Sequence, residues 1–254
     1  MSILSVRGLG KSFGGVRALD GVDFELESGE LLAMIGPNGA GKTTCFNIVN
    51  GQLRADEGSV SIAGQEVAGR APHDICRLGV GRTFQITATF ASMTVRENVQ
   101  VALLAHNRQL YRAWRAVRGH HRAEADAVLR AVGMVEQAER PCAVLAYGDL
   151  KRLELAVALA GAPRLLLMDE PTAGMAPGER TALMALAASL ARERNIGVLF
   201  TEHDMDVVFE HADRVLVLDR GKVIALGSPP QVRASAEVRR VYLGGGPSGG
   251  AHPC

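Results

Sequence analysis

The sequence is poor in cysteine and in net charge. Its four cysteines (Cys45, Cys76, Cys142 and Cys254) stand far apart without a Cys-x-x-Cys pair, so the sequence indicates neither a zinc site nor a disulfide framework. We therefore expect a reducing cytosol as its environment. A formal net charge of +1 over 254 residues gives no overall attraction to nucleic acid, and no nucleic-acid partner is expected.

Long apolar runs and a leader pattern are also missing. No stretch approaches the roughly 18 consecutive apolar residues that span a bilayer as a helix. The first residues, MSILSVRGLGKSF, contain no apolar segment of the signal-peptide type and no cleavage pattern. We expect any membrane association to be peripheral.

The apolar pattern predicts an α/β fold with a mostly parallel sheet. Hydrophobic residues make up 47% of the sequence, which is ample for a buried core. Apolar runs separated by helical patterns predict buried parallel strands, and they lie at 31–35, 165–168 and 198–200. Alternating patterns predict half-buried strands around Val22–Leu26 and Val60–Ile62, and a hairpin joining 215–218 to 223–226.

Helix boundaries are also legible. Thr94 and Glu97 form a possible capping box before an apolar stretch that reaches about Ala105. Pro177 suits the first position of a helix that runs towards Asn195. Further helices are expected at 43–49 and 149–160. We expect one domain over 1–243 with a mostly helical lobe inserted at about 86–147, followed by a Gly-rich flexible tail at 244–254.

Residues 36–43 match the phosphate-loop pattern G-x-x-x-x-G-K-[ST] in full. The match follows a predicted buried strand and precedes a predicted helix, which is the context that the motif requires. Glycines let successive backbone N–H groups surround phosphate oxygens, Lys42 can neutralise the β- and γ-phosphates, and the Thr43 hydroxyl can bind Mg²⁺. The predicted ATP contacts here are Gly36, Asn38, Gly39, Ala40, Gly41, Lys42, Thr43 and Thr44.

Asp169 and Glu170 follow the apolar run 165–168, where a strand is predicted to end. Ligands bind at the carboxyl ends of strands in open α/β sheets. Asp169 can hold Mg²⁺, through water, and Glu170 can orient or deprotonate an attacking water. An acidic pair after a strand is more often a solvated turn or helix cap, and the upstream phosphate loop favours the catalytic role.

Over nearly its whole length the sequence resembles the ATP-binding subunits of ATP-binding-cassette transporters. The resemblance implies a P-loop NTPase core with a mostly parallel sheet, an N-terminal antiparallel β part and an inserted helical lobe. Phe13, in GKSFGG, matches the aromatic residue that stacks on adenine in that family, although a core phenylalanine is the alternative. Gln85, in RTFQ, matches the glutamine that senses Mg²⁺ and the membrane partner. His203, in TEHD, matches the histidine that contacts the γ-phosphate. The resemblance thus implies catalytic roles for Glu170, His203 and Gln85.

Residues 145–149 (LAYGD), here called the signature segment, occupy the place of that family's LSGGQ signature. The resemblance implies that Ala146, Tyr147 and Gly148 contact the ATP held by an opposite subunit, so that two subunits sandwich two ATP molecules head to tail. Two departures bear on coupling between those sites and not on ATP binding. Asp149 replaces the glutamine, and the loop 173–177 (AGMAP) lacks the family's usual Asp or Asn.

Finer resemblance points to the branched-chain amino acid importers. It is carried by RTFQ, MTVRENVQVALLA, LAYGDLKRLELA, TEHDMDVV, the late VYLG and the long insert at 105–123. It implies two membrane-spanning permease subunits, a second ATP-binding subunit (the same chain or a shorter sister), an indirectly coupled solute-binding protein, and a peripheral place at the cytoplasmic face of the membrane. Importers of urea, amides or other amino acids share these features and remain the alternative.

Two other classes of ATPase fit less well. Cassette ATPases of DNA repair or translation typically fuse two cassettes or carry long coiled coils, whereas this sequence has one phosphate loop and no sustained heptads. A small-molecule kinase would not explain Gln85, residues 146–148 and His203 together. The insert is basic and holds Tyr111 and Trp114; we favour a solvated helical face there over a contact with the membrane partner.

Overall fold

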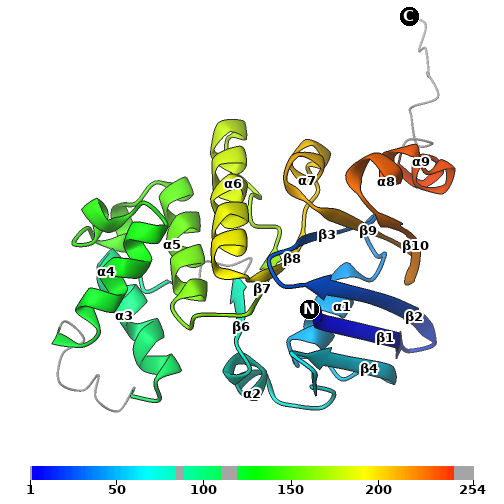
Figure 1. Cartoon of the computed structure of the whole chain (residues 1–254), viewed down its shortest axis with the longest axis horizontal. Helices are drawn as coiled ribbons and strands as arrows, with labels where there is room; N and C mark the ends of the chain where they lie inside the picture. Colours follow the sequence, from blue (N-terminus) through cyan, green and yellow to red (C-terminus); the bar gives the residue numbers. More distant parts are fainter. Residues whose placement is uncertain (1, 84–88, 110–118, 243–254) are drawn as a thin grey trace, which may run out of the picture.

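A six-stranded sheet crosses the molecule, with helices along one face (Figure 1). The computed structural model describes residues 2–83, 89–109 and 119–242. In the order β10-β9-β3-β8-β7-β6, all neighbouring strands are parallel except the β9–β10 hairpin. The strands are β3 (Leu31–Ile35), β6 (Val80–Thr83), β7 (Leu165–Asp169), β8 (Gly197–Thr201), β9 (Arg214–Asp219) and β10 (Lys222–Gly227).

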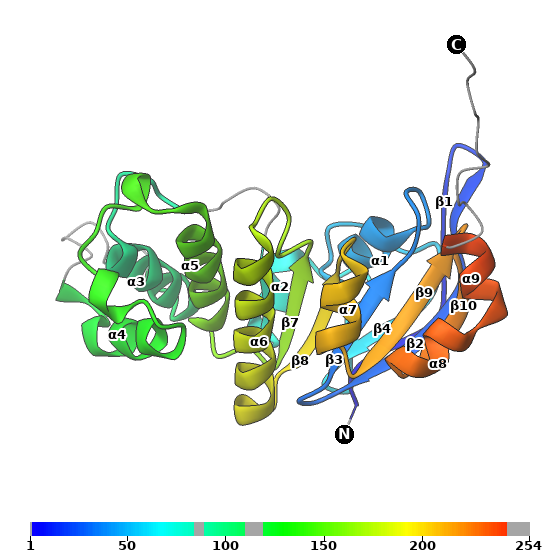
Figure 2. The same cartoon turned by 90° about the horizontal axis from the view of Figure 1, so that it is seen from above.

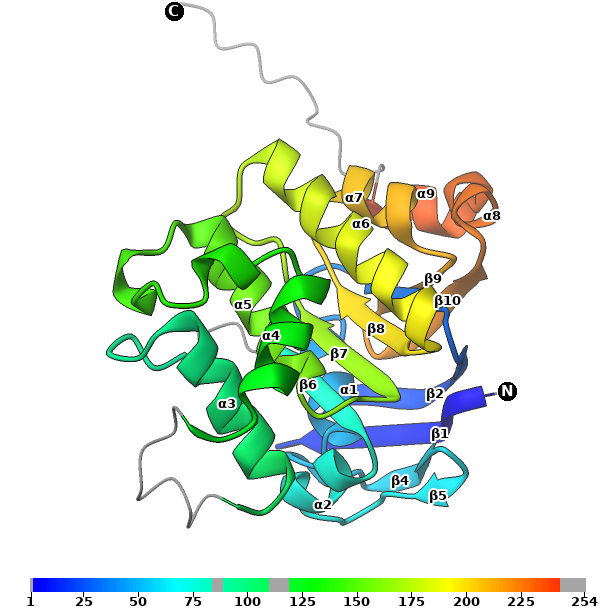
Figure 3. The same ribbon diagram turned by 60° about the vertical axis from the view of Figure 1, so that its left-hand side comes forward.

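A second, antiparallel sheet lies on the other side of the first (Figure 3). Its order is β2-β1-β4-β5, and it confirms the expected N-terminal antiparallel part. Its strands are β1 (Ser2–Phe13), β2 (Val16–Glu27), β4 (Glu57–Ile62) and β5 (Gln65–Glu66). No strand was predicted from the residues of β1. Several register shifts interrupt its pairing with β2 and break the alternation of apolar residues that would have indicated a strand.

Alternate residues of the parallel strands divide the core in two, because successive side chains of a strand point to opposite faces. In β3, Leu32 and Met34 pack between the two sheets around α1 (Lys42–Val49). Leu31, Ala33 and Ile35 face the opposite side. The helices that cover that side include α5 (Tyr147–Leu159), α6 (Pro177–Arg194) and α7 (Met205–His211).

A helical lobe lies at one end of the sheet, beside β6, and the C-terminal helices lie at the other end (Figures 1 and 2). The lobe holds α3 (Val95–His106), α4 (Arg122–Ala131), α5 and two 3₁₀ turns, Val135–Gln137 and Cys142–Val144. The C-terminal helices are α8 (Pro229–Ala234) and α9 (Ala236–Tyr242), and the short α2 (Pro72–Arg77) precedes β6. Within the described ranges, no helix combines the length and the apolar character needed to cross a bilayer.

The local signals placed most elements correctly. The Thr94–Glu97 capping box is present, and Pro177 is the first residue of α6. The helix expected at 149–160 begins two residues earlier, at Tyr147, and the one expected at 43–49 begins at Lys42. The bounds of a single domain at 1–243 with a lobe at about 86–147 stay a prediction, and the tail at 244–254 lies outside the described residues.

Candidate nucleotide-binding site

The phosphate loop joins the end of β3 to the start of α1, and its glycines fit where side chains cannot. A Cβ atom on Gly36 would lie 2.3 Å from the carbonyl oxygen of Leu218, well inside van der Waals contact. Gly41 has a φ of +107°, and a Cβ atom there would lie 2.6 Å from the carbonyl oxygen of Ala18. Glycine is therefore required at both ends of the loop by close backbone packing.

Lys42 is folded beneath this loop. Its ammonium donates hydrogen bonds to the carbonyl oxygens of Gly36 at 2.6 Å and Pro37 at 3.2 Å. Burial lowers the pKa of Lys42, while the nearby Glu170 and Asp169 carboxylates act in the opposite direction. The phosphate loop and the acidic pair, more than 120 residues apart in the sequence, thus share one site.

Asp169 is held by residues from both neighbouring strands. It lies opposite Thr201 in the parallel pairing of β7 with β8, and its Oδ1 accepts a hydrogen bond from the Thr201 hydroxyl at 2.7 Å. On the β6 side, the Arg82 guanidinium lies 3.7 Å from its other carboxylate oxygen. Asp169 is buried, so its carboxylate is fixed before any ligand arrives.

Glu170 turns out of the sheet directly after Asp169. Its φ is +48°, a left-handed conformation that costs about 1–3 kcal/mol for a non-glycine residue. The conformation is held by its N–H, which donates to the hydroxyl of Thr201 at 3.0 Å and to the carbonyl of Thr201 at 3.2 Å. As a result, Glu170 Oε1 lies 2.8 Å from Nε2 of His203, a solvent-exposed side chain. The two predicted catalytic residues therefore contact each other.

Glu202 is a buried residue that the sequence analysis did not single out. Its Oε1 accepts hydrogen bonds from the backbone N–H of Thr172 at 2.9 Å and from the Thr172 hydroxyl at 2.6 Å. It thereby ties the segment after Glu170 to the segment that carries His203. A single carboxylate inside the TEHD motif has no spacing that distinguishes it, and its partner is 30 residues away.

Replacing Glu202 by alanine should lower the free energy of unfolding by about 2–4 kcal/mol, because two buried donors of Thr172 lose their acceptor. Urea denaturation monitored by circular dichroism measures this change. Glu136→Ala, at an exposed glutamate in a 3₁₀ turn of the lobe, is the matched control and should change stability by less than about 0.5 kcal/mol. Equal free energies of unfolding for the two variants would show that the Glu202 contacts do not stabilise the fold.

The comparisons with known proteins agree with this geometry. The family model described as "ABC transporter" matches residues 19–173, which is more than half of the chain and includes the phosphate loop and the acidic pair. The chain belongs to the ABC transporter family. It is accordingly an ATP-hydrolysing subunit of a membrane transporter.

Individual relatives align over almost the full chain. The high-affinity branched-chain amino acid transport ATP-binding protein BraF of Pseudomonas aeruginosa is 40% identical, over 95% of this chain and 98% of BraF. LivG of Escherichia coli K12, which is named for the same transport, is 39% identical over 95% of this chain and 98% of LivG. A solved ATP-binding cassette of an ABC transporter in its ADP conformation has a TM-score of 0.85 and 31% identity, covering 96% of this chain and 99% of that structure.

A second family model, described as "Branched-chain amino acid ATP-binding cassette transporter", matches residues 222–247. Its described part comprises β10, α8 and α9.

Phe13 lies where the first strand of this ABC ATPase ends, at the turn between β1 and β2. Its side chain is 47% exposed, which excludes the alternative of a core phenylalanine. The Lys11 ammonium lies 5.5 Å from the ring centroid. The ring is thus available to a planar ligand from solvent.

The signature segment packs against the loop that follows the acidic pair. Ala146 precedes the first turn of α5, and the Tyr147 hydroxyl donates a hydrogen bond to the carbonyl oxygen of Ala173 at 3.0 Å. A Cβ atom on Gly148 would lie 2.8 Å from the Glu179 carboxylate, so this glycine packs closely against the first turn of α6. Within the described residues, 146–148 make no hydrogen bond to the phosphate loop of their own chain.

The structure describes most of the other predicted site residues, but not all of them. Asn38, Gly39, Ala40, Thr43 and Thr44 lie in the phosphate loop or in the first turn of α1, as the motif predicts. Gln85, predicted to bind Mg²⁺ and the membrane partner, lies outside the described residues, as do the central insert residues 110–118.

The donor set suits Mg²⁺. Asp169 offers one buried carboxylate and Thr43 one hydroxyl at the start of α1. Mg²⁺ commonly takes one or two protein ligands and completes its shell with phosphate oxygens and water. In the described ranges no group of three or more His, Cys, Asp or Glu side chains forms a separate metal cage.

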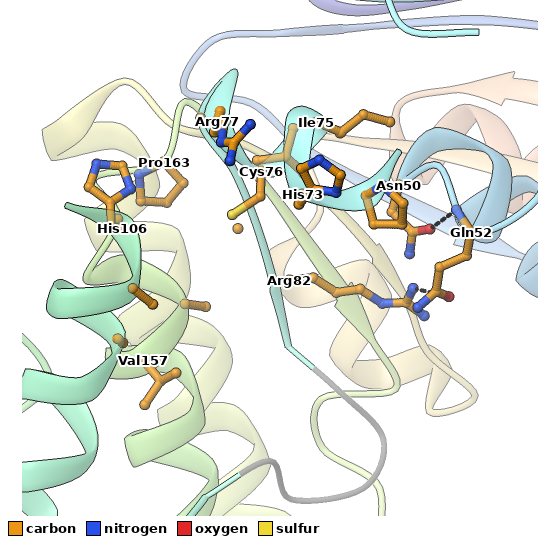
Figure 4. A pocket seen from close by; sticks show the side chains of 18 of the residues that line it. Asn50, Gln52, His73, Ile75, Cys76, Arg77, Arg82, His106, Val157 and Pro163 are labelled. Carbon is orange, nitrogen blue, oxygen red and sulfur yellow. Dashed lines mark hydrogen bonds between the residues drawn. The ribbon is translucent and has the colours of Figure 1, made fainter. Parts of the chain in front are cut away.

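A cavity of about 500 Å³ opens between the sheet and the lobe, next to the nucleotide site (Figure 4). Asn50, Gln52 and Arg82 line one side, and the ends of α3 and α5 line the other. Much of the wall is apolar, including Ile75, Ala102, Ala105, Val157, Ala158 and Pro163. Asn50 is buried, and its Nδ2 has no hydrogen-bond partner in the described structure.

Arg82 joins this cavity to the acidic pair. Its guanidinium donates to Gln52 Oε1 at 2.9 Å within the cavity wall and lies 3.7 Å from Asp169 on its other side. A molecule seated in the cavity is therefore separated from the predicted Mg²⁺ ligand by one side chain. Arg82 could not be recognised from the sequence, because its contacts with Asn47, Gln52 and Asp169 come from a helix, a loop and another strand.

Proposed function

We propose that this ABC ATPase powers the import of branched-chain amino acids. The observation that carries the solute class is the match of 222–247 to the branched-chain amino acid family model. The names of BraF and LivG, which align end to end with this chain, support it. The solute class rests on relatives because a motor subunit does not itself touch the solute.

The geometry supports separate roles for the residues of the nucleotide site. The phosphate loop and Lys42 would bind the ATP phosphates, and Phe13 would stack on adenine. Thr43, Asp169 and Gln85 would hold Mg²⁺, which when bound neutralises charge that develops on the phosphates. Glu170 would accept a proton from the attacking water, while His203 orients its carboxylate through their 2.8 Å contact and lies next to the γ-phosphate.

The signature segment would serve a second ATP-binding subunit. Ala146, Tyr147 and Gly148 lie at the N-terminal end of α5, where backbone N–H groups attract phosphate. We propose that they meet the γ-phosphate held by the opposite subunit of a head-to-tail dimer, formed with the same chain or a shorter sister. ATP binding can drive the two subunits together only if ATP binds the closed dimer more tightly than the open one.

The cavity beside Arg82 would receive a short cytoplasmic helix from one of two permease subunits. Its apolar wall suits a helix face, and the unpaired Asn50 amide offers a donor to a carbonyl of the partner. Seating that helix would move Arg82 and so act on Asp169. The chain would then work at the cytoplasmic face of the membrane, coupled through the permease to a solute-binding protein.

Replacing Ala105 by tryptophan should block this docking. Ala105 is exposed in the last turn of α3 and lines the cavity, so a large side chain fills the space. Recovery of permease with the tagged variant should fall by about tenfold or more, while ATP affinity stays at the wild-type value. Ala127→Trp, at an exposed alanine of α4 away from the cavity, is the control and should recover permease normally.

The function is tested by purifying the tagged chain from gently solubilised native membranes and identifying what comes with it by mass spectrometry. We expect two multi-spanning proteins and a second ATP-binding subunit. Recovery with ribosomes or DNA-processing proteins, and without membrane proteins, would overturn the transport proposal. A co-purified solute-binding protein specific for urea or an amide would instead reassign the solute.

A further inference from the structure

The side chain of Tyr147 stands at a position where the LSGGQ signature has glycine. Tyr147 is the first residue of α5, which lies beside α6 (Figures 1 and 2). Its hydroxyl donates to the Ala173 carbonyl at 3.0 Å, and its ring lies over Gly174, where an added Cβ atom would be 3.4 Å from Cε1 of the ring. One side chain of the signature segment therefore contacts two consecutive residues of the loop after the acidic pair.

A buried ion pair holds the Tyr147 ring from within α5. The Lys151 ammonium, one turn further along the helix, lies 5.5 Å from the ring centroid, within the range of a cation–π interaction. The same ammonium donates to Glu154 Oε2 at 3.1 Å, and both charged side chains are buried. A buried cation needs every partner it can reach. The ring is one of these partners and is thereby held in place, although Tyr147 is 44% exposed.

The loop that Tyr147 contacts is joined directly to Glu170. The backbone N–H of Ala173 donates to the Glu170 carbonyl at 3.2 Å, while the Ala173 carbonyl accepts from the Tyr147 hydroxyl. Between them, Thr172 is anchored by the buried Glu202. Two successive hydrogen bonds thus connect the backbone of the catalytic glutamate to the first residue of α5.

We infer that Tyr147 is a positioning residue whose side chain couples the two ATP sites of the dimer. The inference rests on the proposed function, in which Glu170 acts on the ATP of its own chain and the signature segment meets the ATP of the opposite subunit. The Tyr147 hydroxyl then links one site to the other within a single chain, through a loop that lacks the Asp or Asn usual in the family. Coupling of this kind is a free energy shared by both sites, and it is measured as cooperativity.

Tyr147→Phe removes the hydroxyl and keeps the ring over Lys151, so it tests the hydrogen bond without disturbing the buried ion pair. In the complex purified from membranes, we expect the Hill coefficient of ATP hydrolysis to fall from above one in wild type to about one, and kcat to fall about three- to tenfold. The Kd of the isolated chain for a fluorescent ATP analogue depends on its own phosphate loop and should change less than about twofold.

Ser189→Ala, which removes an exposed α6 hydroxyl that donates to Glu193, is the matched control and should leave all three quantities unchanged. The Hill coefficient separates coupling from stability, because a loss of folded protein lowers the apparent kcat and leaves the Hill coefficient as it was.

Three outcomes would overturn the inference. The first is a Tyr147→Phe complex with the wild-type Hill coefficient, whether or not kcat falls. The second is a wild-type complex whose turnover depends hyperbolically on ATP, and the third is a weakened Kd of the isolated variant, since the hydroxyl would then act on the site of its own chain. Failure of the proposed dimer looks different, because Glu170→Gln would then form no ATP-bound dimer, whereas failure of the inference alone leaves that dimer intact.

Discussion

Replacing Lys42 by alanine should weaken ATP binding by about 10- to 100-fold, the equivalent of losing charge-assisted hydrogen bonds worth about 1.5–3 kcal/mol. The effect on hydrolysis should be larger, because the ammonium also faces the charge that develops on the transferred phosphoryl group. Isothermal titration with ATP and a steady-state phosphate-release assay measure the two losses separately.

The variant also removes the hydrogen bonds from Lys42 to Gly36 and Pro37, so its melting temperature must be recorded alongside. Arg130→Ala, which deletes an exposed cation of the lobe, is the control for a general charge effect and should bind ATP normally. Full ATP affinity in a folded Lys42→Ala protein would remove Lys42 from its assigned role.

Exchanging Glu170 for glutamine should reduce ATP hydrolysis by about 10²- to 10⁴-fold, which is the usual contribution of a general base. Glutamine has nearly the same shape and keeps an oxygen that can accept from His203, so the 2.8 Å contact can persist. ATP binding should therefore stay near the wild-type value. With hydrolysis blocked, an ATP-bound dimer should accumulate, and gel filtration with multi-angle light scattering would detect it.

Glu136→Gln, at an exposed carboxylate of the lobe, makes the same chemical change away from the site and should leave turnover unaltered. If Glu170→Gln hydrolysed ATP at the wild-type rate, another group would have to activate the water. The double variant with His203→Ala then separates orientation from proton transfer, because a purely orienting histidine adds little once the carboxylate is gone.

The parts of the site that the sequence predicted well are those coded by contiguous residues. The phosphate loop is one continuous motif with fixed local geometry, and the structure places it between β3 and α1 as expected. Asp169 and Glu170 were predictable because a run of apolar residues ends at a pair of charges. His203 was assigned through family resemblance, and the structure brings it against Glu170.

The residues that escaped prediction act across the sheet. Arg82, Thr201 and Glu202 contact the acidic pair or its following loop only because β6, β7 and β8 are neighbours in the fold. No short motif encodes the order of strands in a sheet, so no local sequence pattern predicts these contacts.

The elements β6, α8 and α9 were not predicted, because their local sequence patterns are weak. β6 is a short strand with glycine and arginine in its middle, and it is stabilised by pairing with β7. Similarly, α8 and α9 are each shorter than two full turns and are held by Val232 and Val238. Tertiary packing decides such segments, whereas propensity and periodicity decide the longer ones.

The most direct test of the central claim is solute uptake by the transporter assembled with this chain. The complex recovered from membranes is reconstituted into liposomes with ATP on the side of the ATPase and the solute-binding protein on the other, and accumulation of radiolabelled leucine is measured. The account predicts uptake that requires ATP, is competed by isoleucine and valine but not by urea, and disappears with Glu170→Gln. Leucine uptake that persists with the Glu170→Gln subunit, or no ATP-dependent uptake of any solute, would contradict it.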